Sequence, residues 1–155
     1  MKTLKTTNIN IENLKKAHKF MNSVDRKLFS MVQYRNVGSK TSHKCGTVGC
    51  IIGHCVYLTP MEVIDESYRF PKKSHNGGDI MFTKWSYDFF GLSEFDDLGE
   101  NIWDYLFNHQ WSYVSEFNTI RHAQYRIQRV IDGYVPESFG KELEKELKDL
   151  EAYNS

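Results

Sequence analysis

The side chains that could carry out chemistry are concentrated in residues 43–55 of this chain. The segment holds all three cysteines, two of the six histidines and three of the ten glycines. These residues are Cys45, Cys50, Cys55, His43, His54, Gly46, Gly49 and Gly53. Thiols and imidazoles serve as nucleophiles or metal ligands, whereas glycines allow a ligand or a second helix to approach the backbone closely. Three interpretations follow: a metal site, a cysteine nucleophile and a ligand cradle.

A metal site would draw its ligands from Cys45, Cys50 and His54. Cys50 and His54 are four positions apart, so they share one face if the segment is helical. Four residues separate Cys45 from Cys50 and Cys50 from Cys55, which is not the spacing of a zinc knuckle. We therefore expect no cofactor and keep zinc at these three residues as an alternative.

An enzyme would use Cys45 as its nucleophile. Cys45 precedes a predicted helix, whose N-terminal dipole stabilises a thiolate, and His43 or His54 could act as the base. The sequence offers no third residue to orient that base. A cysteine-dependent hydrolase or transferase is therefore the alternative function, and catalytic residues are not expected.

A ligand cradle is the most economical interpretation. Glycines at a helix start leave backbone amides free to bind an anion such as a phosphate or a carboxylate. The predicted ligand-binding residues are Arg35, His43, Lys44, Cys45, Gly46, Thr47 and Val48. In this interpretation Cys50 and Cys55 are small buried hydrophobic residues, which is the commonest role of a free cysteine.

Length and composition indicate one folded domain that spans residues 1–155. The chain is 40% hydrophobic and 14% aromatic, as in globular proteins. It has no apolar run of the roughly 18–20 residues that a membrane span requires, and its first residues lack the apolar region of a signal peptide. An odd number of cysteines favours a reducing compartment. We expect a cytoplasmic protein with no membrane contact.

The net charge of zero conceals a strong asymmetry. Residues 1–45 carry ten Lys or Arg and two Asp or Glu, a net charge of +8. Residues 46–155 carry ten Lys or Arg and eighteen Asp or Glu, a net charge of −8. The two parts could attract each other, or the basic part could bind an anion. The overall neutrality argues against a nucleic acid as the partner.

Apolar periodicity predicts an all-α fold, a single compact multi-helix domain with the option of one short β ribbon near residues 28–34. Helices are expected over residues 11–24, 47–58, 59–65, 82–89, 100–107, 120–131 and 138–153. Expected N-caps are Asn8 or Asn10, Thr59 and Asn118, and expected C-terminal glycines are Gly91 and Gly133. The last helix has only a narrow leucine stripe, which suits a peripheral helix or the seam of a homo-oligomer.

A basic strip is expected on the helix over residues 120–131. It consists of Arg121, His122, Arg126 and Arg129. We interpret the strip as a solvated face that pairs with the acidic C-terminal helix, and a phosphate site is the alternative.

The cysteine segment also carries a family resemblance. With Phe29-Ser30-Met31 before it, the run from Cys45 to His54 resembles small uncharacterised proteins of bacteriophages and bacteria that share a Phe-x-Met…Cys-Gly-Thr-x-x-Cys-x-x-Gly pattern. The later matching residues are Phe90-Gly91-Leu92, Leu106-Phe107, Trp111, Arg126-Ile127, Gly133 and Pro136. The resemblance implies a phage-associated cytoplasmic protein. Small phage proteins of this kind counter host defences by binding a partner or by sequestering a nucleotide signal.

These observations lead to a non-enzymatic binding protein, phage-encoded, as the expected function. Its ligand would be a small anionic molecule, such as a nucleotide derivative, or a host protein.

Overall fold

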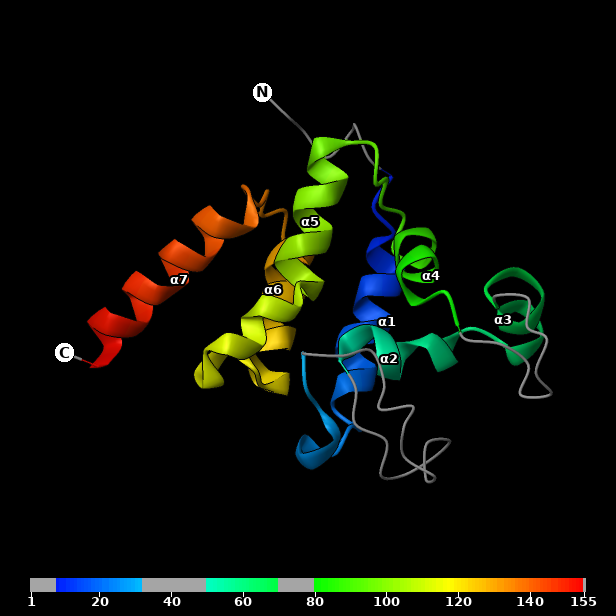
Figure 1. Ribbon diagram of the computed structural model, residues 1–155, viewed down its shortest axis with the longest axis horizontal. Helices are drawn as coiled ribbons and strands as arrows, with labels where there is room; N and C mark the ends of the chain where they lie inside the picture. Colours follow the sequence, from blue (N-terminus) through cyan, green and yellow to red (C-terminus); the bar gives the residue numbers. More distant parts are fainter. Residues whose placement is uncertain (1–7, 32–49, 70–79, 155) are drawn as a thin grey trace.

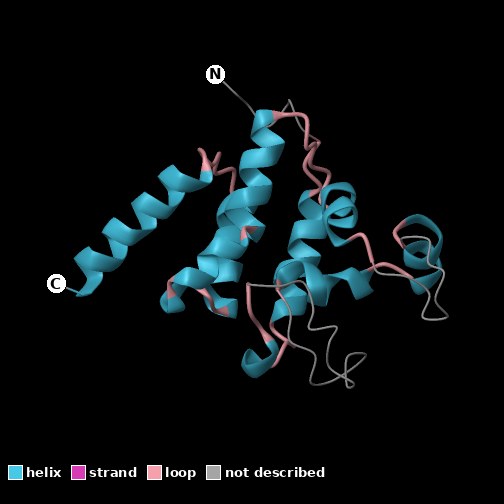
Figure 2. Cartoon of the chain, viewed as in Figure 1, coloured by secondary structure: helices cyan, strands magenta, loops and turns pink. Residues whose placement is uncertain are grey.

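The computed structural model describes residues 8–31, 50–69 and 80–154, and within these ranges the chain is all-α, as predicted. Figure 2 shows helices joined by loops, with no β-sheet in the described residues. The α-helices are α1 (Ile11–Met21), α2 (Ile51–Cys55), α3 (Met61–Ser67), α4 (Phe82–Phe89), α5 (Asp97–Phe107), α6 (Ile120–Ile131) and α7 (Phe139–Asn154). Short 3₁₀ helices cover Arg26–Leu28, Val56–Leu58, His109–Tyr113 and Ser115–Phe117. Of the β ribbon expected near 28–34, Leu28 ends a 3₁₀ helix and residues 32–34 lie outside the described residues.

The first helix begins where the sequence predicts and ends three residues early. The Asn10 side chain accepts a hydrogen bond from Asn13 N at 3.0 Å, which caps the helix start. After Met21 the chain turns, and the Ser23 hydroxyl donates to Phe20 O at 2.7 Å. Such a bond from a serine competes with the continuing helix ladder. The buried face of α1 consists of Leu14, Ala17 and Met21.

In Figure 1, α1, α5 and α6 lie near the centre of the molecule. α1 packs against α6 and α2, α5 packs against α6 and α7, and α2 packs against α4. α3 lies at one end of the view and α7 runs out at the opposite end to the C-terminus (Figure 1). Among the described residues, no helix is both long and apolar enough to cross a membrane.

Aromatic side chains form much of the core. Trp85 and Phe90 lie edge to face at 6.0 Å, and Phe90 lies 5.2 Å from Phe107 of α5. Trp111 and Phe117 meet edge to face at 5.7 Å below α6. Aromatic pairs at such distances add about 0.5–1.5 kcal/mol beyond the area that they bury. The contacts of Phe90 join the turn after α4 to α4 and to α5, and the Trp111–Phe117 contact joins the two 3₁₀ helices between α5 and α6.

Two predicted helix caps are wrong because long-range partners use the side chains. The Thr59 hydroxyl accepts the indole N–H of Trp85 at 2.9 Å and makes no cap bond to α3. The Asn118 side-chain oxygen accepts a hydrogen bond from Met31 N at 2.7 Å. Thr119 caps α6 instead, accepting from the N–H three residues further on at 3.1 Å.

Two predicted glycine stops are confirmed. Gly91 has a φ of +67° and Gly133 a φ of +99°, backbone conformations that L side chains rarely adopt. At the first stop, Leu92 N donates to Tyr87 O at 2.8 Å, which turns the chain back along the end of α4. Asn10 N also donates to Phe90 O at 2.8 Å, so the start of α1 packs against this turn.

Candidate functional site

Most of the predicted ligand-binding segment lies outside the described residues. Residues 32–49 contain Arg35, His43, Lys44, Cys45, Gly46, Thr47 and Val48. The anion cradle and the Cys45 nucleophile therefore stay predictions. Of the eight residues singled out in this segment, Cys50, Gly53, His54 and Cys55 belong to the described part of the chain.

The two described cysteines are buried and protonated. Cys50 immediately precedes α2 and is 2% exposed, and Cys55 ends the helix with no exposed surface. Burial raises the pKa of the Cys50 thiol from 9.0 to about 11, although nearby backbone N–H groups partly oppose the shift. Burial also raises the pKa of Cys55, and the neighbouring Cys50 adds to the effect. Both thiols therefore act as small apolar side chains at neutral pH, as the ligand-cradle interpretation expected.

His54 has a structural contact across the fold. Its Nε2 lies 2.8 Å from Leu28 O, and because a carbonyl can only accept, the ring nitrogen carries the proton there. The bond joins α2 to the 3₁₀ helix that follows α1. Of the alternative zinc ligands, Cys45 lies outside the described residues, while within them no group of three or more His, Cys, Asp or Glu side chains could hold a metal ion.

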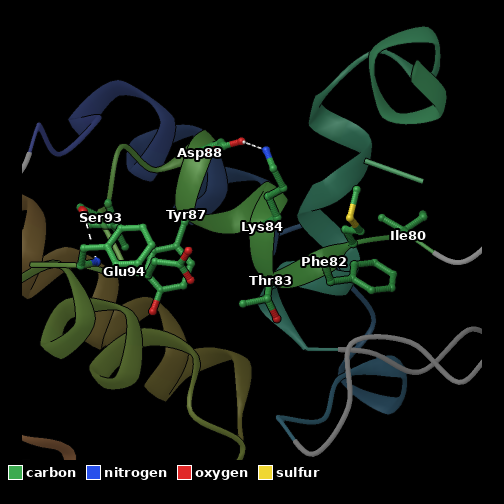
Figure 3. A pocket seen from close by; sticks show the side chains of 11 residues that line it. Ile80, Phe82, Thr83, Lys84, Tyr87, Asp88, Ser93 and Glu94 are labelled. Atoms are coloured by element: carbon green, nitrogen blue, oxygen red, sulfur yellow. Dashed lines mark hydrogen bonds and ion pairs between the residues drawn. The ribbon is translucent and has the colours of Figure 1, made fainter. Parts of the chain in front are cut away.

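The described residues form a pocket of about 670 Å³ between α4 and the turn that leads to α5 (Figure 3). Six of its lining residues are apolar or aromatic, and the other five are polar or charged. The lining residues are Ile80, Met81, Phe82, Thr83, Lys84, Tyr87, Asp88, Leu92, Ser93, Glu94 and Phe95. This size and composition are typical of ligand-binding pockets in proteins.

Helix periodicity in α4 places its side chains on two sides. Trp85 and Ser86 face the core, with Trp85 held by Thr59 and the Ser86 hydroxyl donating to Thr83 O at 2.7 Å. The opposite side of the helix contributes Thr83, Lys84, Tyr87 and Asp88 to the pocket. The turn after α4 brings residues 92–95 back alongside it, so the second wall depends on the backbone conformation of the glycine at position 91.

The ring of Tyr87, which lines the pocket, packs against α5. The ring of Tyr87 stacks on Trp103 of α5 with centroids 5.5 Å apart and planes 8° from parallel. The indole N–H of Trp103 donates to the Ser86 hydroxyl at 2.7 Å. Phe95 is 92% exposed at the opposite wall. One aromatic side chain is thus fixed by packing and the other is presented to solvent.

The charged groups of the pocket differ in how far they are neutralised. Lys84 Nζ lies 3.0 Å from Asp88 Oδ2, and the Tyr68 hydroxyl donates to the same oxygen at 2.9 Å. Burial, together with this carboxylate, raises the pKa of Tyr68 to about 12. Across the pocket, Glu94 is exposed and makes no hydrogen bond or ion pair within the described residues (Figure 3). The lining has one cation and two carboxylates, so its formal charge is −1.

The expectation of a solvated basic strip on α6 is wrong for Arg126. This side chain is fully buried, stacks on the Trp111 ring at 4.1 Å, and donates to Glu146 at 3.3 Å and to Phe117 O at 3.1 Å. Helical spacing puts Arg126 on the same face as Ala123, so it enters the interior with its neighbours. Pairing with the C-terminal helix is confirmed, but it takes place inside the protein.

Two more charged side chains, the partly buried Arg129 and the buried Glu142, make structural contacts nearby. Arg129 lies over the Tyr134 ring at 3.7 Å and donates to the Tyr105 hydroxyl at 3.0 Å. Glu142 of α7 is fully buried and accepts from the Tyr134 hydroxyl at 2.7 Å and from Glu137 N at 2.8 Å. Two carboxylates one turn apart therefore anchor α7 to the rest of the chain.

Sequence reasoning did not identify the pocket as a site. It predicted the helix over residues 82–89 and its glycine stop, but it assigned no role to Glu94 or Phe95. The one local signal is an aromatic residue among acidic neighbours just after a helix stop, which is also typical of an ordinary turn. Only the packing of α4 against α5 shows that these residues enclose a volume.

The comparisons of this chain with known proteins found no match. No family model, no curated protein and no solved structure matches this chain. The function is therefore inferred from the geometry and the chemistry of the pocket.

Proposed function

We propose that this chain is a non-enzymatic binding protein and that the pocket between α4 and the turn before α5 is its binding site. The observation that carries the proposal is a pocket of about 670 Å³ whose lining includes a phenylalanine that is 92% exposed. Covering a phenylalanine side chain contributes about 1.5–3 kcal/mol, which a partner would gain on binding. Exposed aromatic residues at the edge of a pocket are typical anchors of interfaces.

The pocket favours a protein partner over a small anion. Its lining has a formal charge of −1, and its one cation, Lys84, is already paired with Asp88. An anion would therefore meet net repulsion. An apolar or aromatic side chain of a partner would instead gain contacts with Leu92 and Tyr87. The anionic ligand stays a prediction for residues 35–48.

The chemical groups of the pocket suit recognition better than catalysis. A nucleophile needs a base within hydrogen-bonding distance, and a third group to orient that base. The charged groups here are the ion pair of Lys84 with Asp88 and the separate carboxylate of Glu94. The resemblance to small phage proteins extends the proposal to a phage-encoded protein that binds a host protein in the cytoplasm and so counters host defence.

The proposal is tested by titrating the ¹⁵N-labelled protein with p-cresol, which imitates an aromatic side chain, and following the backbone amides by NMR. We expect saturable shifts confined to residues 80–95, with a Kd of about 1 mM for a ligand of this size. Phe95→Ala should weaken binding severalfold. Tyr153→Ala removes an equally exposed aromatic ring from α7 and should leave the Kd unchanged. Shifts that do not saturate, or that scatter over the whole surface, would contradict the proposal.

A further inference from the structure

We propose that the pocket recognises an arginine side chain presented by a protein partner. This inference rests on the proposed function and specifies its ligand. It combines three features of the pocket: an uncompensated carboxylate, aromatic surface beside it and an apolar floor. Each has a counterpart in the chemistry of arginine.

The charges that line the pocket favour a cation next to Glu94. On the α4 side, Asp88 is neutralised by Lys84 at 3.0 Å and also accepts the hydroxyl of Tyr68. On the other side, Glu94 has no ion pair or hydrogen bond in the described residues. Figure 3 shows Glu94 and Lys84 on opposite sides, with Tyr87 between them. A ligand cation would therefore be attracted toward Glu94 and kept away from Lys84.

The aromatic surface selects a cation that can stack. Phe95 follows Glu94 directly and is 92% exposed, so its ring is accessible to a ligand bound at that carboxylate. Tyr87 presents a second ring, held in place by its stack on Trp103. A guanidinium is planar, is weakly hydrated and stacks on aromatic rings, and its fork of N–H groups matches a carboxylate. An ammonium group fits the charge but not the stacking.

The chain itself places arginines in this kind of environment. Arg126 lies over the Trp111 ring at 4.1 Å while it donates to Glu146. Arg129 lies over the Tyr134 ring at 3.7 Å. An aromatic face beside a carboxylate is thus the setting in which this fold already holds a guanidinium. The pocket offers the same pair of groups without an internal arginine among its lining residues.

The apolar floor accommodates the rest of the side chain. The three methylenes of arginine can lie along apolar surface while the charged end stays at the rim. Leu92 supplies such surface, and a volume of about 670 Å³ exceeds what one side chain needs. The remaining space would receive neighbouring residues of the partner, which is why a protein segment, and not a free small cation, is the proposed occupant.

The test compares N-acetyl-L-arginine amide with N-acetyl-L-citrulline amide, which has nearly the same shape without the charge. Binding to the full chain is followed by NMR at the amides of residues 80–95. We expect the arginine compound to bind about fivefold more tightly than citrulline, as a partly exposed ion pair with ring stacking provides. Glu94→Gln should reduce arginine binding to the citrulline level. Glu62→Gln, an exposed acid of α3, is the matched control and should change nothing.

Every outcome bears on the inference. Equal affinity for the two compounds, or an arginine affinity that Glu94→Gln leaves unchanged, would overturn it. If p-cresol binds in the pocket and the arginine compound does not, the inference fails while the proposed function stands. If neither compound nor p-cresol shifts these amides, both fail. Self-association that Glu94→Gln abolishes would identify a second copy of the chain as the occupant and would overturn the assignment to a separate partner.

Discussion

Replacing Glu146 by alanine should destabilise the protein by about 3–5 kcal/mol, because it leaves the guanidinium of Arg126 buried without its counter-charge. The Arg126 side chain has no exposed surface, and the Glu146 side chain is only 7% exposed. After the substitution, the guanidinium would keep its bond to Phe117 O and its stack on Trp111, neither of which neutralises it. In a domain of this size such a loss lowers Tm by about 6–20 °C.

Replacing both partners should have a very different effect. Burial raises the pKa of Glu146 and lowers that of Arg126, even though each side chain attracts the charged form of the other. Burial therefore disfavours both charges by more than their attraction returns. Arg126 Nε and Glu146 Oε2 are also buried without hydrogen-bond partners in the described residues. The double variant Arg126→Met with Glu146→Leu should be neutral or more stable than the native protein, by up to about 4 kcal/mol.

Urea unfolding followed by tryptophan fluorescence measures these free energies, with the m-value as a check on two-state behaviour. The control is Glu144→Gln, which breaks an exposed pair with Lys148 on the same helix and should cost less than about 0.5 kcal/mol. If Glu146→Ala also costs less than about 1 kcal/mol, the pair behaves like a surface ion pair and the reasoning is refuted. A double variant less stable than Glu146→Ala would refute it as well.

Three further predictions concern the frame of the pocket and the thiols. In urea unfolding, Gly91→Ala should destabilise the protein by at least about 2 kcal/mol, since its φ is +67° and the new Cβ would overlap a backbone carbonyl at the start of α1. The control is Gly140→Ala, where a Cβ meets open space in α7, and it should stabilise the protein by about 0.5–1 kcal/mol. Equal effects of the two substitutions would contradict this prediction. Cys50 and Cys55 should resist iodoacetamide at pH 8 in the folded protein and react only after unfolding, because burial keeps both thiols protonated. Mass spectrometry of the labelled peptides measures this, and rapid labelling of either cysteine in the folded protein would be inconsistent with the prediction. Thr59→Val should cost about 1–3 kcal/mol in the same urea assay by leaving a buried indole N–H without an acceptor, and a neutral result would mean that this bond does not matter.

Local patterns were sufficient for most of the helices. The spacing of Ile120, Ala123 and Ile127 predicts α6, and a leucine stripe predicts α7 to within a residue or two of its bounds. Gly91 and Gly133 mark the ends of α4 and α6, because their backbone angles exclude most other residues. These features depend on side chains a few positions apart, so periodicity and stop signals detect them.

Caps and charges were decided by distant partners. Asn118 has the side chain of a good N-cap, but Met31, 87 positions earlier, takes its oxygen. Thr59 is similarly engaged by Trp85. The same spacing that predicts α6 puts Arg126 on its buried face, yet a buried guanidinium is tolerable only with Glu146 of another helix beside it. A helical pattern predicts which face of the helix a residue occupies, but it does not predict which residues of other elements the side chain contacts.

Local sequence patterns were enough to predict the helical class, most helix bounds and the two glycine stops, whereas they left the role of Cys50 and Cys55 open among three interpretations. Those properties follow from local conformational preference and from the free energy of moving apolar groups out of water. Only the tertiary packing shows that the turn after α4 folds back beside Tyr87, that Trp103 supports that ring, and that Glu94 has no partner among the described residues while it lies next to an exposed Phe95. A pocket is the space left between elements that pack together, so its position depends on contacts between residues far apart in the chain.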